Sequence, residues 1–153
     1  MKILTLGDFL DRELAFRKRL NAYYAKIRDR TEDNGIRLLT YHLGRDRGRH
    51  AIALSNLPRE TIDHARKAAF VGEEPFDPKV ERRLPAFDPA TVTGNDLLED
   101  AVSRQSRQAL RYRILLTQFS DEAVRIVLAA LVHVKERDID LMKKMQTMHY
   151  FDR

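Results

Sequence analysis

The sequence predicts an all-α protein in which four long helices form a bundle, arranged as two antiparallel hairpins joined by a long crossover. Glycine is scarce, with 6 in 153 residues, and runs of β-branched residues are short. Apolar residues recur at alternating spacings of three and four along four stretches, which places them on one face of a helix. A chain of this length suits one domain, and we assign residues 1–153 to it.

The first helix is expected from about Leu6 to Arg28. Thr5 and Asp8 have the spacing of a capping box, in which each side chain bonds the backbone N–H of the other residue. The predicted apolar face consists of Phe9, Phe16, Leu20, Tyr23 and Ile27. Glu13 occupies the slot between the two phenylalanines, so a carboxylate interrupts an otherwise apolar stripe.

A second helix is expected from about Ile36 to Leu54, after a turn at residues 31–35 that ends in glycine. The short turn pairs the first two helices as an antiparallel hairpin. Pro58 closes the second helix, because proline lacks the amide hydrogen that a helix interior needs. The predicted stripe is Ile36, Leu39, Leu43, Asp46, His50, Ala53 and Leu57.

Residues 58–92 are expected to form the crossover. The segment 59–70 has the periodicity of a short helix, with Ile62, Ala65 and Ala69 on one face. The segment 71–89 carries most of the prolines and is expected to be a long loop. It also contains three apolar residues that we expect to pack along the bundle, namely Val80, Leu84 and Phe87.

The third helix is expected to start at Thr93 and to run to about Phe119, and the fourth from about Glu122 to Met148. Ser120 and Asp121 provide the cap of the fourth helix. The predicted stripe of the third helix is Leu98, Val102, Gln105, Ala109, Tyr112, Leu116 and Phe119. That of the fourth is Val124, Val127, Leu131, Val134, Asp138, Leu141, Met145 and Met148.

Polar residues interrupt all four predicted stripes near the middle of each helix. They are Glu13 in the first helix, Asp46 or Arg47 with His50 in the second, Gln105 in the third, and Asp138 with Lys135 one turn away in the fourth. A buried carboxylate is unfavourable unless it is paired or bound to a metal. Because the four interruptions lie at similar heights, we expect a shared polar layer in the interior.

The chain resembles the ferritin-like superfamily, its rubrerythrin-like members in particular, from Leu6 to Met148. The residues that carry the resemblance include Asn21-Ala22-Tyr23-Tyr24-Ala25-Lys26 and the step His50-Ala51. The resemblance implies a ferritin-like four-helix bundle. It also implies a di-iron site built from one Glu on each of two helices and a Glu-x-x-His pair on each of the other two.

Carried over to this sequence, the di-iron pattern is incomplete. The first Glu falls at or next to Glu13. An alignment without a gap between this position and the His would instead place Leu14 there. The first Glu-x-x-His falls on Arg47-Gly48-Arg49-His50, so the His is kept and the Glu is replaced by Arg. The third-helix Glu falls near residues 102–105, where there is no carboxylate. The second pair falls on Lys135-Glu136-Arg137-Asp138, where Lys and Asp replace Glu and His.

These replacements change the charge of the layer. With His50 neutral, the positive Arg47 and Lys135 balance the negative Glu13 and Asp138 without any metal ion. We therefore interpret the layer as a metal-free network of ion pairs and hydrogen bonds that includes Gln105. The alternative is a residual mononuclear metal site formed by Glu13, Asp46, His50 and Asp138, whose nitrogen and oxygen ligands would suit iron, manganese or zinc.

The leading functional hypothesis is a ferritin-like protein without a complete di-iron centre and without a cofactor, acting as a structural or interaction module. The alternative is an iron-dependent oxidase or peroxidase of the rubrerythrin or ferritin type that uses the residual site, so enzymatic activity stays open. A third hypothesis is a nucleic-acid-binding relative, as in the DNA-protecting group of ferritins. Arg104, Arg107 and Arg111 recur at helical spacing, but no aromatic residues alternate with them as a single-strand binder would need.

The composition bears on location and assembly. The chain has no cysteine, no apolar stretch long enough for a membrane span, and an N-terminal apolar run too short for a signal peptide. The net charge of +5 comes from interleaved signs, typical of a solvated helical surface. We expect a soluble, cytoplasmic protein. Apolar residues off the main stripes predict a homodimer, namely Leu10, Leu14, Tyr24, Leu110 and Leu115.

Overall fold

The structure is a computed structural model, and it describes residues 4–70 and 78–148, without the side chains of Asp46, Arg47, Pro78 and Val80. Within those ranges the regular secondary structure is helical, apart from an isolated bridge between Thr5 and Ala69. The helices are α1 Leu6–Arg30, α2 Asn34–Leu43, α3 Asp46–Ser55, α4 Arg59–Arg66, α5 Pro78–Glu81, α6 Gly94–Gln118 and α7 Glu122–Thr147. The prediction of an all-α protein is confirmed.

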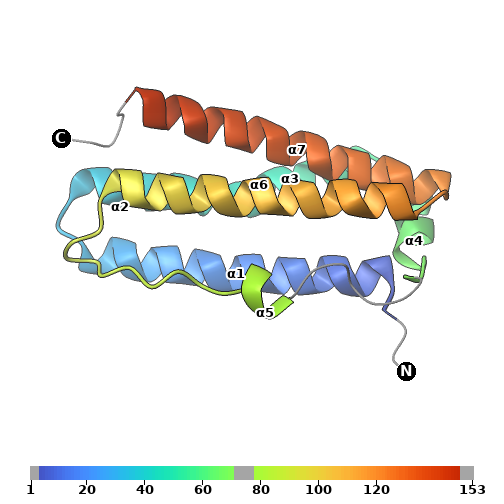
Figure 1. The fold of residues 1–153 in the computed structure, drawn as a ribbon, viewed down its shortest axis with the longest axis horizontal. Helices are drawn as coiled ribbons and strands as arrows, with labels where there is room; N and C mark the ends of the chain where they lie inside the picture. Colours follow the sequence, from blue (N-terminus) through green and yellow to red (C-terminus); the bar gives the residue numbers. More distant parts are fainter. Residues whose placement is uncertain (1–3, 71–77, 149–153) are drawn as a thin grey trace.

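The long helices lie lengthwise beside one another (Figure 1). α6 and α7 form a hairpin and pack most extensively against each other, while α2 and α3 follow one another along the molecule and contact α1. α4 lies at the end where α1 begins and packs against α7. The segment after α5 returns beside α1 to the start of α6 (Figure 1), and the Phe87 backbone N–H donates to the Tyr23 hydroxyl at 2.7 Å.

Side-chain caps explain where the long helices begin. In α1 and in α6 a threonine and an aspartate three residues later form a capping box, Thr5 with Asp8 and Thr93 with Asp96. The carboxylate of Asp121 accepts the Val124 N–H at 3.1 Å at the start of α7. Each cap satisfies amide groups that have no partner inside the helix. The predicted starts of these three helices are confirmed.

The prediction of one continuous helix from Ile36 to Leu54 was wrong. α2 ends at Leu43, and a turn at residues 44 and 45 separates it from α3. Gly44 has a low helix propensity. In addition, the Thr40 hydroxyl donates to the Ile36 carbonyl at 2.8 Å and to the Arg37 carbonyl at 3.0 Å, and side-chain bonds of this kind to the helix backbone slightly destabilise helices.

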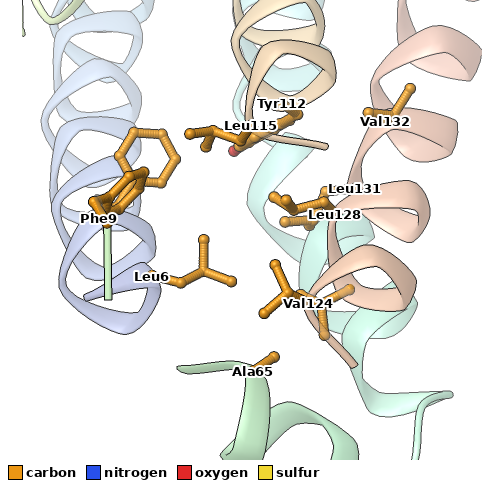
Figure 2. Packing of buried hydrophobic residues seen from close by; sticks show 11 residues of the cluster. Leu6, Phe9, Ala65, Tyr112, Leu115, Val124, Leu128, Leu131 and Val132 are labelled. Carbon is orange, nitrogen blue, oxygen red and sulfur yellow. The ribbon is translucent and has the colours of Figure 1, made fainter. Parts of the chain in front are cut away.

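Two apolar cores fill the interior. The core near α4 is drawn in Figure 2, where Leu6 and Phe9 of α1 point toward Leu115 of α6 and Val124 of α7. Its buried members are Leu6, Phe9, Ala65, Phe70, Tyr112, Leu115, Val124, Val127, Leu128, Leu131 and Val132. The core toward the other end consists of Tyr24, Ile27, Ile36, Leu39, Leu97, Leu98, Ala101 and Met142. In α1 these cores leave a central stretch that includes Glu13, and buried polar side chains occupy it.

The predicted stripe of α7 drifts away from the buried face in the second half of the helix. Leu141 and Met148 are 48% and 69% exposed, while Lys135, Ile139 and Met142 are buried instead. The predicted stripe advanced by seven residues for every two turns. A straight α-helix rotates by about 20° relative to such a repeat. After three repeats the predicted positions had therefore left the buried face.

The residues that predicted a homodimer do not form one outward face. Tyr24 and Leu115 are buried in the protein's own cores, and Leu10 packs against the core near α4. Leu110 is exposed. The homodimer stays a prediction, and most of the apolar residues on which it was based pack inside the protein's own cores. Across the described residues, no helix has both the length and the apolar character that crossing a membrane requires.

Two glycines in helices provide a matched stability test. A Cβ on Gly7 would lie 3.0 Å from the Arg66 carbonyl oxygen, so α1 approaches α4 closely there, whereas a Cβ on Gly48 would meet nothing within 4 Å. We expect Gly48→Ala to raise the free energy of unfolding by up to about 1 kcal/mol through helix propensity. Gly7→Ala should lower it by about 1–2 kcal/mol through overpacking. Urea denaturation measures both, and an equal gain at the two sites would contradict the α1–α4 packing.

The cap of α7 provides a pH test. The His64 imidazole, 2.9 Å from Asp121, lowers the pKa of that carboxyl, and the Val124 N–H lowers it further. A carboxyl with a depressed pKa stabilises the fold above its unfolded pKa, and this contribution disappears as the pH falls through the folded pKa. We expect His64→Phe to raise the pKa of Asp121, as followed by carboxyl-carbon NMR. His133→Phe, which replaces an exposed histidine of the same protein, should leave that pKa unchanged.

Candidate functional site

Glu13 lies between the two cores, and its side chain is 1% exposed. Arg111 Nη2 donates to both carboxylate oxygens of Glu13, at 3.1 Å each. Gln108 Nε2 donates to Oε2 at 3.1 Å, and Arg82 Nη2 donates to Oε1 at 3.3 Å. Charged donors stabilise a buried carboxylate more strongly than neutral ones. The prediction of a polar residue inside the stripe of the first helix is confirmed at Glu13.

A second carboxylate extends this cluster. Glu81, the last residue of α5, accepts a hydrogen bond from Arg111 Nη1 at 2.6 Å and lies 3.3 Å from Arg107 Nε. Arg111 thus bridges two carboxylates with its two terminal nitrogens. We call this cluster the acid–arginine centre, and it consists of Glu13, Glu81, Arg82, Arg107, Gln108 and Arg111. In it, three guanidinium groups surround two carboxylates.

The third helix supplies a different amide from the one predicted. Gln105 is half-buried and lines a small pocket with Asp138 and Met142, away from Glu13. Gln108 takes the predicted role, because it lies one turn further along α6 and is buried against Glu13. In the parts of the chain that the structure describes, Gln105 Oε1 is buried and accepts no hydrogen bond.

Asp138 belongs to a separate polar group. Its side chain is 4% exposed, and its Oδ1 lies 2.6 Å from Nε of Arg49, which is 41% exposed. Arg49 of α3 is thus a charge partner of Asp138. The sequence analysis assigned the balancing positive charges of the layer to Arg47 and Lys135. The Arg47 side chain lies outside the described residues, so its place in the layer stays a prediction. Lys135, one turn before Asp138, is fully buried, as expected for a member of the polar layer.

His50 points into the interior, and its burial is confirmed. It lines a pocket of about 260 Å³ together with Leu14 and Arg17 of α1. Arg17 is also buried, and its Nη2 donates to the Tyr112 hydroxyl at 2.8 Å. Whether His50 reaches Glu13, Asp46 or Asp138 stays a prediction. The layer is thus wider than the sequence suggested, since it includes Arg17.

The predicted metal ligands are divided between groups with different partners. Glu13 is held by Arg111 and Gln108, while Asp138 is paired with Arg49. Among residues 4–70 and 78–148, apart from the undescribed side chains, no three His, Asp or Glu residues come together to hold a metal ion. The Asp46 side chain lies outside the described residues, so the four-residue metal site stays a prediction.

The arginines of α6 that suggested nucleic-acid binding are engaged within the protein. Arg104 Nε donates to Asp100 at 2.8 Å, and its Nη1 donates to the Arg83 carbonyl at 2.5 Å. Arg107 pairs with Glu81, and Arg111 is buried between two carboxylates. Phosphate groups would have to compete with these internal acceptors, so the contacts do not favour a nucleic-acid face.

Besides Gln108, two further members of the centre were not identified by the sequence analysis. Glu81 and Arg82 lie in the crossover, where only apolar residues were considered as packing elements. One sequence feature could have indicated that Glu81 and Arg82 contact the polar layer. It is the charged run Glu81-Arg82-Arg83, which directly follows Val80 in a segment expected to pack along the bundle. A charged run in a loop that covers a polar layer can supply partners to that layer.

Comparisons with protein-family models, with curated proteins and with solved structures find no match to this chain. The resemblance to the ferritin-like superfamily therefore stays a prediction from the residues quoted above. The acid–arginine centre and the Arg49–Asp138 pair are the features from which a function can be argued.

We expect Glu13→Gln to lower the free energy of unfolding by about 3 kcal/mol, because the change leaves buried guanidinium groups short of a counter-charge. The double variant Glu13→Leu with Arg111→Met should cost less than the two single changes added together, since fewer charges are stranded. Glu99→Gln, at an exposed acid of α6, is the matched control and should change stability by less than about 0.5 kcal/mol. Urea denaturation that gave equal values for Glu13→Gln and the control would contradict the described contacts.

Proposed function

We propose that this chain is a ferritin-like four-helix scaffold in which the acid–arginine centre replaces a metal centre, and that it acts as a structural or interaction module without catalysis. The observation that carries the proposal is the environment of Glu13. Its two oxygens accept hydrogen bonds from Arg111, with Gln108 and Arg82 completing the shell. In the di-iron proteins of this superfamily, the corresponding carboxylates face metal cations.

The order of the helices supports the ferritin-like part of the proposal. α2 and α3 together span the length of one long helix, so α1 pairs with α2 and α3 as one hairpin, and α6 pairs with α7 as the other. The connection between α3 and α6 is long, and its part after α5 runs beside α1 (Figure 1). Two helical hairpins joined by one long crossover is the topology of ferritin-like bundles.

Electrostatics supports the metal-free part. Arg111 and Arg82 lie within hydrogen-bonding distance of Glu13, and both are largely withdrawn from water. A divalent cation at Glu13 would lie close to these guanidinium groups in a region of low effective dielectric, where repulsion between like charges is strong. Metal binding there would require the arginines to leave their buried positions.

The alternative function is an iron-dependent oxidase or peroxidase that uses a residual site at Glu13, Asp46, His50 and Asp138. One observation favours it, namely that His50 and Asp138 are both buried on facing elements, α3 and α7. Imidazole and carboxylate groups suit iron. This alternative predicts metal-dependent stability, because binding of a metal to the folded state stabilises it.

We expect protein purified after growth with added iron to hold far less than one iron per chain by elemental analysis. Thermal melts of the parent should be the same with and without a chelator. Asp138→Ala should lower the melting temperature equally in both conditions, because it strands the charge of Arg49 and not a metal ion. About one or two irons per chain, or a chelator shift of many degrees in the parent, would refute the proposal and favour the oxidase. A ferroxidase assay would then test that activity directly.

A further inference from the structure

A groove of about 610 Å³ lies on the outside of the molecule between α3 and α7. Ile52, Val134 and Leu141 form apolar parts of its wall, and Arg49, Arg137 and Asp138 provide its charged groups. Two small residues, Ala53 of α3 and Ala130 of α7, leave space where larger side chains would fill the line of contact between the helices. The groove is separate from the acid–arginine centre, which lies among α1, α6 and the crossover.

The apolar residues of the groove are unusually open to solvent. Ile52 is 64% exposed, although isoleucine is among the residues most often buried, and Leu141 is 48% exposed. They lie on different helices and line one groove. Exposed apolar surface that is contiguous and edged by polar groups is typical of a binding site.

The charged groups leave an excess of positive charge in the groove. The one carboxylate, Asp138, is buried and already paired with Arg49 Nε. Within the described part of the chain, Arg137 forms no ion pair, and Arg49 has no partner other than Asp138. The terminal nitrogens of two guanidinium groups are thus available at a partly apolar groove, and guanidinium groups bind carboxylates in a bidentate manner.

The size of the groove fits a small amphipathic molecule. A volume of about 610 Å³ lies within the range of small-molecule sites. Along α7 the lining residues run from Ala130 to Leu141, which corresponds to roughly 16 Å at the α-helical rise. A second copy of the chain is a poor occupant, because each copy carries a net charge of +5 and would approach a basic groove.

We propose that this groove binds an amphipathic monocarboxylate, with the carboxylate on Arg49 and Arg137 and the apolar chain along Ile52 and Val134. The proposal goes beyond the function proposed above and does not depend on the absence of a metal in the interior. Apolar burial supplies affinity, while the arginines select the charge of the head group.

Calorimetric titration with monomeric dodecanoate tests the proposal. We expect saturable binding of dodecanoate, weaker binding of dodecanol, and none of dodecyltrimethylammonium, because the three probes share a tail and differ in head-group charge. Arg137→Gln should weaken dodecanoate binding by about tenfold, the effect of one charged contact. Ile52→Gln should weaken binding of both dodecanoate and dodecanol. Both positions are exposed, so these variants should fold like the parent.

Arg12→Gln, at an exposed arginine of α1, is the matched control for net charge and should bind dodecanoate like the parent. An equal loss of affinity in Arg12→Gln and Arg137→Gln would overturn the proposal, because the effect would then come from overall charge. Equal binding of the anionic and cationic probes would also overturn it. Binding only to phosphatidylglycerol vesicles would indicate a membrane surface, and a dimer disrupted by Ile52→Gln in sedimentation would indicate a second copy; either result would replace the proposed occupant.

Discussion

A carboxylate inside a helical protein is stable only when cations and hydrogen-bond donors surround it, and Glu13 meets this condition through groups from α6 and the crossover. Arg111 bonds both of its oxygens, and Arg82 adds a contact from the segment after α5. Because Arg111 also holds Glu81, the same guanidinium fixes the crossover against α6. One buried arginine therefore contributes both to the packing of α1 against α6 and to the position of the crossover, which the Phe87–Tyr23 hydrogen bond also holds.

The acid–arginine centre interrupts a continuous line of apolar contacts, so it also fixes the position of α1 along the axis of α6. Apolar cores tolerate many arrangements as long as volume is conserved. A buried ion pair tolerates few, since a shift by one turn would leave Glu13 or Arg111 in an apolar core without a counter-charge. Two apolar cores that flank one polar centre thus define a register for α1 against α6. Buried ionic groups are best known for this role in coiled coils.

The sequence predicted the features that depend on neighbouring residues and missed those that depend on distant ones. The capping box at Thr5 and the start of the third helix at Thr93 are local features, and so is the apolar periodicity that places Glu13 within an apolar stripe. The choice of Gln108 in place of Gln105 depends on the rotation of α6 against α1, and a period of 3.5 cannot fix that rotation in a helix with 3.6 residues per turn. Arg82 and Glu13 are 69 residues apart in the sequence, and no local pattern encodes their contact.

The Arg49–Asp138 pair lies at the boundary between the interior and the outer groove, and both residues line the groove and the smaller inner pocket. Asp138 is withdrawn from water, while Arg49 is partly open to it, so the pair separates the groove from a smaller pocket near Gln105 and Met142. The energy of the buried carboxylate therefore depends on where Arg49 lies. An anion bound in the groove would compete with Asp138 for that guanidinium, unless it uses the terminal nitrogens while Nε stays with Asp138. Arginine permits this division because its donors point in several directions from one rigid plane, which a lysine ammonium in the same place would not provide.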